Sequence, residues 1–200
     1  LCDRRQRQMC IRDRNYCCKN ASATGFSRGV DSFDTICSLS ENSMEKLSHL
    51  TFFNVGSHRS TANYTPEQSA ELYKNRLEIA KKSAKIFDMP LIDINSNLGE
   101  HLTLPYVKVH HYCSFSAVLC MQKFFKNYYY ASGYPISSFS IKQCDTGSAH
   151  YEAFTASMLS TESTDFYITG LEKTRLEKVD FISKFPITYD NLLSLIHISE

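Results

Sequence analysis

Short β-prone segments alternate with amphipathic helical segments along most of this chain, and this alternation is the strongest constraint on its fold. Strands separated by helices of more than ten residues are typical of parallel βαβ units, whose right-handed crossovers place helices on both faces of a sheet. The pattern therefore predicts an α/β fold, a Rossmann-like doubly wound sheet of about five parallel strands. The expected strands cover residues 21–26, 50–55, 91–94, 128–131 and 166–169.

The most strongly specified helix begins after Thr65. The segment from Thr65 to Gln68 combines an N-cap threonine, a proline in the first turn and a glutamine that closes a capping box. Apolar residues then recur at spacings of three and four, and Pro90 marks the end of the helix.

Three further helices are predicted from the same signals. They cover residues 31–39, with Asp31 as a cap, residues 109–125, and the run that a second capping box opens at Thr174 and Pro186 ends. Residues 142–162 are less regular and are interpreted as a lid or a substrate loop.

Both ends of the sequence differ from the rest of the chain. Residues 1–14 and 194–200 resemble translated sequencing adapter of the kind found in metagenomic gene models, although a disordered basic tail is the alternative for the first. Without them we expect a single domain over residues 15–193, truncated at both ends. Removing five basic and three acidic residues changes the net charge from +1 to −1. Such a nearly neutral domain offers no electrostatic reason to expect a nucleic-acid or membrane partner.

The cysteines and the hydropathy pattern suit a cytoplasmic enzyme. Two of the eight cysteines, Cys2 and Cys10, fall in the excluded segment, and the other six show no C-x-x-C spacing. Unpaired cysteines of this kind are typical of a reducing compartment. No apolar run approaches the roughly 20 residues that span a bilayer, and no secretory signal pattern is visible.

The loop after the first expected strand carries the residues most indicative of function. Small hydroxyl residues, a glycine and an acid at the start of a helix let backbone N–H groups and the helix dipole converge on an anion. In a doubly wound sheet, ligands bind beyond the carboxyl ends of the strands, where the strand order reverses. The loops after the second and fourth strands should flank this loop. The expected nucleotide-binding residues are Ser27, Arg28, Gly29, Val30, Asp31, Ser32, Gly56, Ser132 and Gly133.

The pattern S-x-G-x-D-S, from Ser27 to Ser32, resembles the PP-loop (S-G-G-x-D-S) of the ATP pyrophosphatase, or adenine nucleotide alpha hydrolase, superfamily. The 7-cyano-7-deazaguanine synthases and the asparagine-synthase-like proteins are the most similar branch. The resemblance implies a HUP-type domain that cleaves ATP to AMP and pyrophosphate while it adenylates a small-molecule substrate. It also implies Mg²⁺ as a cofactor, and a homodimer or an amidotransferase as a partner.

The resemblance further implies a role for each matched residue. The hydroxyls of Ser27 and Ser32, with the N–H groups from Gly29 onwards, would hold the β- and γ-phosphates. Asp31 would bind the Mg²⁺ that bridges the phosphates. Arg175 and Lys178 are candidates by position and not by the motif, because they lie in the first turns of the last helix, near the expected carboxyl edge of the sheet. With Asp31 they are the expected catalytic groups and would neutralise phosphate charge; a solvated helix face is the alternative for these two.

Arg28 departs from the family pattern, because the second glycine of the PP-loop is usual at this position. A cationic side chain here either adds a phosphate contact or crowds the loop. The alternative function is therefore a non-catalytic module that binds ATP or AMP, and a third possibility is a fragment that does not fold alone.

Outside this loop, His58 and Arg59 follow the second strand and are either ribose or adenine contacts or part of a surface loop. Glu162 is expected to be a helix cap or loop residue, with a substrate or metal contact as the alternative. His110, His111 and Cys113 suggest a zinc site, but adjacent histidines diverge on a helix and no partner cysteine pair exists, so a structural role is expected.

Overall fold

All five strands of the sheet run parallel, in the order β3-β2-β1-β4-β5. The computed structural model describes residues 20–41, 46–58, 65–102, 104–142 and 147–193. The predicted α/β, doubly wound architecture is confirmed. The interpretation of residues 1–14 and 194–200 as adapter lies outside the described residues and stays a prediction. The strands are β1 (Ala21–Gly25), β2 (His49–Asn54), β3 (Leu91–Asn95), β4 (Phe125–Ala131) and β5 (Asp165–Thr169).

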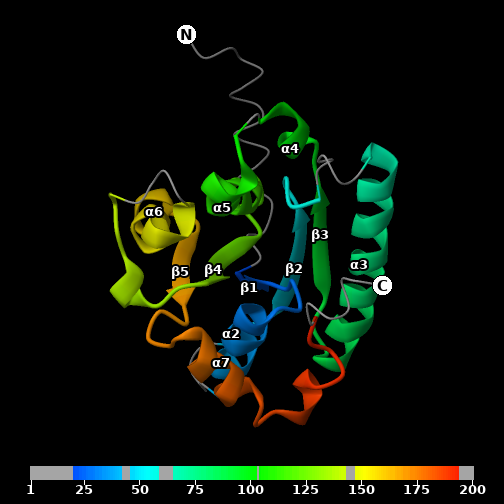
Figure 1. Ribbon diagram of the computed structural model, residues 1–200, viewed down its shortest axis with the longest axis vertical. Helices are drawn as coiled ribbons and strands as arrows, with labels where there is room; N and C mark the ends of the chain where they lie inside the picture. Colours follow the sequence, from blue (N-terminus) through cyan, green and yellow to red (C-terminus); the bar gives the residue numbers. More distant parts are fainter. Residues whose placement is uncertain (1–19, 42–45, 59–64, 103, 143–146, 194–200) are drawn as a thin grey trace.

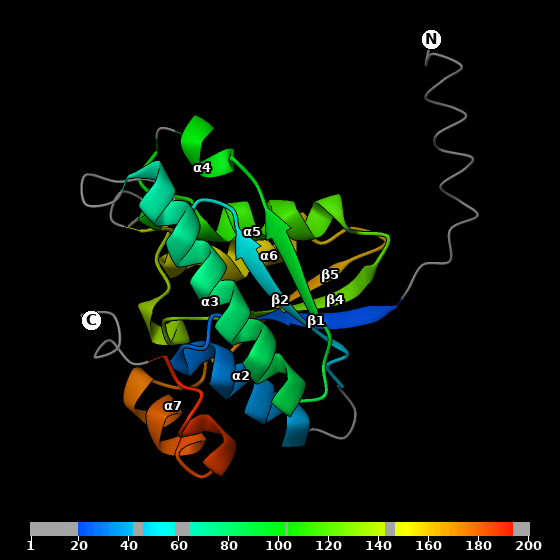
Figure 2. The ribbon, with the colours of Figure 1, turned by 90° about the vertical axis from the view of Figure 1, so that its right-hand side faces the viewer.

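Helices cover both faces of the sheet (Figures 1 and 2). One face carries α2 (Val30–Glu41) and α3 (Pro66–Ile86), with α7 (Arg175–Ile182) packed against α2. The other carries α5 (His110–Cys120) and α6 (Glu152–Leu159). The remaining elements are short: α4 (Leu98–His101) and the 3₁₀ turns η1 (Tyr106–Lys108), η2 (Ile136–Ser138), η3 (Ser148–Tyr151) and η4 (Pro186–Thr188).

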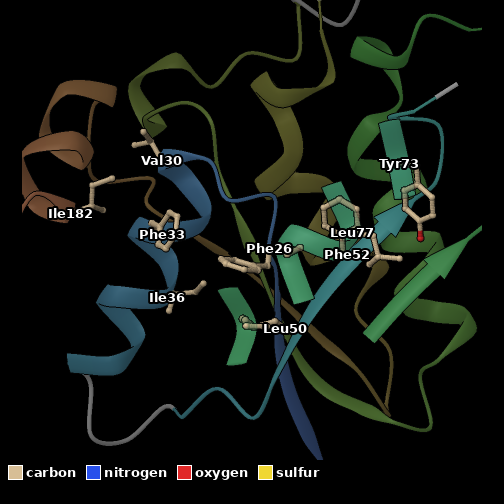
Figure 3. Packing of buried hydrophobic residues seen from close by; sticks show 11 residues of the cluster. Phe26, Val30, Phe33, Ile36, Leu50, Phe52, Tyr73, Leu77 and Ile182 are labelled. Carbon is tan, nitrogen blue, oxygen red and sulfur yellow. The ribbon is translucent and has the colours of Figure 1, made fainter. Parts of the chain in front are cut away.

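Each face of the sheet has its own hydrophobic core. Phe26, Phe33 and Leu50 are fully buried between β1, β2 and the helices α2 and α3 (Figure 3). On the opposite face, Phe115 of α5 and Phe125 of β4 lie in the second cluster. Two buried faces are what a parallel sheet with crossover helices requires.

The sequence interpretation is wrong in two places. The helix predicted over residues 109–125 ends at Cys120, and β4 begins at Phe125, because an aromatic-rich run pairs with β1 and packs in the core. Residues 142–162 are not a plain loop: within them η3 and α6 form, and Ala156 is buried against the sheet.

The strand order reverses between β1 and β4. Consecutive strands β1, β2 and β3 extend the sheet in one direction, and β4 then pairs with the other edge of β1. The loops that follow β1 and β4 therefore leave the carboxyl edge side by side, and a crevice at this edge is the usual ligand site of such sheets.

The predicted capping box of α3 is confirmed. The Thr65 hydroxyl accepts a hydrogen bond from the N–H of Gln68, and the Gln68 side chain accepts one from the N–H of Thr65. We expect Thr65→Ala to lower the free energy of unfolding by about 1 kcal/mol, because one amide at the helix start loses its acceptor. Urea denaturation measures this, with Lys82→Ala on the exposed face of α3 as the control. Equal midpoints for the two variants would contradict the prediction.

Candidate functional site

The loop after β1 turns sharply at Arg28. This residue adopts a φ of +62°, the left-handed region that favours glycine, and α2 begins two residues later at Val30. Arginine therefore occupies a position whose backbone conformation favours glycine. A left-handed backbone costs a residue with a side chain roughly 1–2 kcal/mol, so the surrounding structure must stabilise it.

The C-terminal segment supplies that stabilisation. The Arg28 guanidinium donates from Nε to the carbonyl oxygen of Asn191 at 3.0 Å, and the N–H of Leu193 donates to the Arg28 carbonyl at 2.7 Å. Burial lowers the pKa of Arg28 from its ordinary value. The Arg28 side chain is thus anchored to the segment that follows η4.

The N-terminus of α2 presents free backbone donors. The N–H of Gly29 is bonded to Ser27 Oγ at 3.3 Å, and Ser32 Oγ donates to the Gly29 carbonyl at 2.8 Å. Within the described ranges, the N–H groups of Val30, Asp31 and Ser32 have no hydrogen-bond acceptor. Three amides beside two hydroxyls therefore remain available to an anion.

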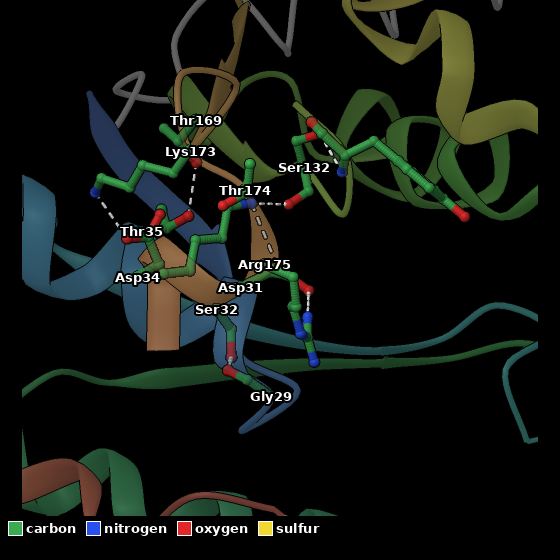
Figure 4. Close-up of polar contacts among 12 residues, drawn as sticks. Gly29, Asp31, Ser32, Asp34, Thr35, Ser132, Thr169, Lys173, Thr174 and Arg175 are labelled. Carbon is green, nitrogen blue, oxygen red and sulfur yellow. Dashed lines mark hydrogen bonds and ion pairs between the residues drawn. The ribbon is translucent and has the colours of Figure 1, made fainter. Parts of the chain in front are cut away.

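Asp31 lies at the second position of α2, so its predicted role as the cap is wrong. Its carboxylate instead pairs with two cations of α7: Arg175, and Lys178 at 3.3 Å between Oδ1 and Nζ (Figure 4). The Arg175 side chain is 58 % exposed, whereas Lys178 is buried. The structure thus brings together the three residues predicted as catalytic.

Lys178 also joins the loop after β4 to this cluster. Its Nζ donates to the Ser132 carbonyl at 2.5 Å. Space for this ammonium depends on Gly170, which has a φ of +73° after β5. A Cβ at Gly170 would lie 2.9 Å from Lys178 Cε, Lys178 Nζ and Asp34 Oδ2.

A second buried ion pair holds the start of α7 against α2. Lys173 Nζ lies 2.7 Å from Asp34 Oδ1 (Figure 4). It also lies 3.0 Å from Ser38 Oγ. Burial raises the pKa of Asp34, and the hydrogen bond from Lys173 opposes this rise. The pair fixes α7 at the distance that lets Lys178 reach Asp31.

A cleft of about 390 Å³ opens beside the loop after β1. Thr51 and Tyr128 lie at its floor and share a hydrogen bond of 2.9 Å between their hydroxyls. Burial, with a contribution from the charge of Arg76, lowers the pKa of His58 to about 4. His58 is therefore neutral at pH 7. The loop residues Ser27, Arg28, Gly29, Asp31 and Ser32 line one side of the cleft, and Phe52, Phe53, Ser57, His58, Arg76 and Tyr106 line the other.

Several residues named from the sequence do not line this cleft. Gly56, with a φ of +113°, is buried beneath Tyr106. Gly133 lines a separate cavity, and Glu162 is exposed. His111 is fully buried, and neither ring nitrogen has a hydrogen-bond partner among the described residues. Arg59 lies outside the described residues.

Sequence reasoning missed Arg76, Tyr106 and Glu152. Arg76 lies one residue before a core position of α3, and Tyr106 follows a connection without a strong pattern, so neither carries a local signal. Glu152 does have a local signal, because it is an acidic residue inside the segment interpreted as a substrate loop. Among the described residues no group of three His, Cys, Asp or Glu side chains is placed to hold a metal ion.

Glu152 is 2 % exposed. Burial raises its pKa to about 7; the Ser132 hydroxyl and the Lys178 charge lower it, and the Asp31 charge adds to the rise. A carboxyl whose folded pKa exceeds its unfolded value destabilises the protein as pH rises through this interval.

We therefore expect Glu152→Gln to gain stability relative to the unchanged protein between pH 5 and pH 8. A rise in pKa of this size corresponds to a change of about 3 kcal/mol in the free energy of unfolding. Urea denaturation at the two pH values measures the difference, and Glu162→Gln, an exposed carboxyl, should show none. If Glu152→Gln changes the free energy of unfolding equally at both pH values, the raised pKa of Glu152 is refuted.

No family model and no curated protein matches the chain. Among solved structures, the U34-tRNA thiolase NcsA from Methanococcus maripaludis, described with its [4Fe-4S] cluster, is similar with 13% sequence identity and a TM-score of 0.48. The match covers 95% of this chain and 65% of the thiolase chain.

In the described part of this protein, no helix has the length and apolar character needed to cross a membrane.

Proposed function

We propose that this domain binds ATP and uses it to adenylate a small-molecule substrate, with release of pyrophosphate. The observation that carries the proposal is the group of three amides at the start of α2 without acceptors in the described chain, beside Ser27 and Ser32. They lie where the strand order of the sheet reverses, and phosphates bind at such helix N-termini. The S-x-G-x-D-S pattern identifies the ATP pyrophosphatase superfamily as the best candidate family.

The cleft suits the two ends of ATP. The polyphosphate would contact the α2 amides, with Arg175 and Lys178 close enough to offset its charge. The opposite side of the cleft, with Phe52, Tyr106 and neutral His58, offers aromatic surface for adenine. The resemblance to the ATP pyrophosphatases also implies that adenine lies near the second strand, which is the side of the cleft given to adenine here.

The reaction requires the protein to position the reactants and does not require a covalent intermediate with the protein. A substrate oxygen attacks the α-phosphorus, the bond to the β-phosphate oxygen breaks, and pyrophosphate leaves with the electron pair. Backbone amides and cations stabilise the charge that accumulates on the leaving group. Mg²⁺ would supply further charge neutralisation. Asp31 would hold it through the oxygen that now pairs with the exposed Arg175, because this ion usually takes one or two carboxylates together with phosphates and water.

Pyrophosphate release tests the proposal. The protein is incubated with ATP, Mg²⁺ and a panel of small carboxylic acids and amides, and pyrophosphate is measured. We expect Ser27→Ala to weaken ATP binding about tenfold, because an exposed hydroxyl donor to a charged phosphate is lost. Ser137→Ala, on an exposed part of η2, is the control. Equal ATP affinity of the two variants would refute the site.

A second candidate function, ATP or AMP binding without turnover, is favoured by Arg28 in the place of glycine. Arg28→Gly separates the two. A catalytic loop adapted to arginine should lose its anchor to Asn191 and release pyrophosphate more slowly. A degenerate loop should show no release in the unchanged protein and should gain it, if at all, only with glycine.

A further inference from the structure

We propose that a second cavity, beside Glu152, binds an amine, and that Glu152 takes up the proton that the amine nitrogen loses when it displaces AMP. This inference rests on the proposed function, because the amine would attack the adenylated substrate. After the substrate oxygen has attacked ATP, a second nucleophile would displace AMP from the adenylated substrate. The inference assigns this second nucleophile to one chemical class, the amines.

The cavity adjoins the cleft at the carboxyl edge of β4. It encloses about 410 Å³ and shares Asp31, Tyr130 and Ala131 with the cleft. Its other walls come from α5, η3 and α6, and they include His110, His150 and Glu152. A ligand in this cavity would therefore approach an adenylated substrate from the side opposite to β2.

The buried carboxylate of Glu152 is incompletely hydrogen-bonded by the described residues. The residue is 2 % exposed, and its Oε1 has no hydrogen-bond partner in the described part of the chain. A buried carboxylate oxygen without a donor is costly and uncommon in folded proteins. A ligand N–H in the adjoining cavity would satisfy it.

One of two histidines in the cavity wall adds an acceptor. Nδ1 of His110 lies 3.1 Å from the Val107 carbonyl, and Nδ1 of His150 lies 3.0 Å from the Ser138 carbonyl. Because a carbonyl only accepts, Nδ1 is the donor in each contact, and Nε2 of the His110 ring is left to accept a hydrogen bond. Burial lowers the pKa of His110, which favours its neutral form.

The charges around the cavity also favour an amine. No lysine or arginine is among the described residues that line it. The groups that act on Glu152 are the Ser132 hydroxyl, the Lys178 ammonium of α7 and the Asp31 carboxylate of α2. Of these, Asp31 and Lys178 are paired with each other. His110 of α5, His150 of η3, Tyr130 and Tyr134 line the same cavity. The lining is therefore rich in acceptors, which suits a ligand rich in donors and disfavours an acid.

The chemical step is balanced without a further reactant. The amine attacks as its neutral free base, which has the electron pair: its nitrogen attacks the carbon that carries the adenylate, a C–N bond forms, and the C–O bond breaks with its electrons leaving on AMP. The proton of the nitrogen passes to Glu152. The pKa of about 7 is suitable for a base that works near neutral pH.

Binding is tested on the whole unchanged protein, with methylammonium chloride as the probe. The carboxyl ¹³C signal of Glu152, assigned by its loss in Glu152→Gln, is followed through a pH titration. We expect its midpoint to fall when methylammonium is added and to stay in place with potassium chloride at equal ionic strength. No shift, or the same shift with both salts, would overturn the amine site. This result does not depend on whether the protein turns ATP over.

Turnover provides the second test, with methylamine and hydrosulfide compared as nucleophiles. We expect Glu152→Gln to lower kcat/KM for methylamine about 100-fold and to remove a pH limb near 7, with Glu162→Gln unchanged. Methylamine turnover that Glu152→Gln leaves intact, or a preference for hydrosulfide, would overturn the inference while pyrophosphate release persists. Absence of pyrophosphate release with every acid would instead refute the proposed function.

Discussion

Gly170→Ala is expected to lower the free energy of unfolding by about 3 kcal/mol and to abolish ATP-dependent activity. The backbone at Gly170 has a φ of +73°, which a side chain adopts only at a cost. The new Cβ would also lie 2.9 Å from Lys178 Nζ and Asp34 Oδ2. Lys178 would have to leave Asp31 and the Ser132 carbonyl, and separating a buried ion pair is strongly destabilising.

Gly133→Ala is the matched control for this prediction. Gly133 has no positive φ, and a Cβ there meets no atom of the described chain within 4 Å. Urea denaturation of both variants and the unchanged protein measures the difference. Equal unfolding midpoints for the two alanine variants would show that Lys178 does not need the space at Gly170.

Asp31→Asn is expected to reduce pyrophosphate release at least about 100-fold and to cost about 3 kcal/mol of stability. The loss of activity follows from the loss of the one carboxylate at the start of α2 that would hold Mg²⁺. The loss of stability follows from Lys178, whose buried ammonium would lose the charge of the carboxylate with which it pairs while it keeps the Ser132 carbonyl. The exposed pair with Arg175 should contribute little, because solvent screens it.

A double variant separates these two effects. Asp31→Asn combined with Lys178→Met removes both charges of this pair, the buried ammonium and the half-buried carboxylate, and it should recover most of the stability without recovering pyrophosphate release. Calorimetric unfolding and a pyrophosphate assay on the single and double variants provide the measurements. Stability that stays low in the double variant would mean that the ion pair is not what Asp31 contributes to the fold.

Local sequence patterns predicted much of the fold. The capping boxes at Thr65 and Thr174 both form as predicted, since they depend on residues three positions apart. The boundary between α5 and β4 was mispredicted because helix periodicity and strand propensity overlap there, and pairing with β1 decided it. The candidate site was anticipated at the loop after β1, but the wall formed by Arg76 and Tyr106 was not.

The sequence by itself determined that strands alternate with helices and that a hydroxyl- and glycine-containing turn opens the first helix, because these features depend on neighbouring residues. Only the tertiary structure decided the partners of Asp31, which lie 144 and 147 residues away on α7. It also decided the burial of Glu152 beside a cavity. Charge pairing and desolvation depend on which distant segments come into contact, and no local pattern encodes that contact.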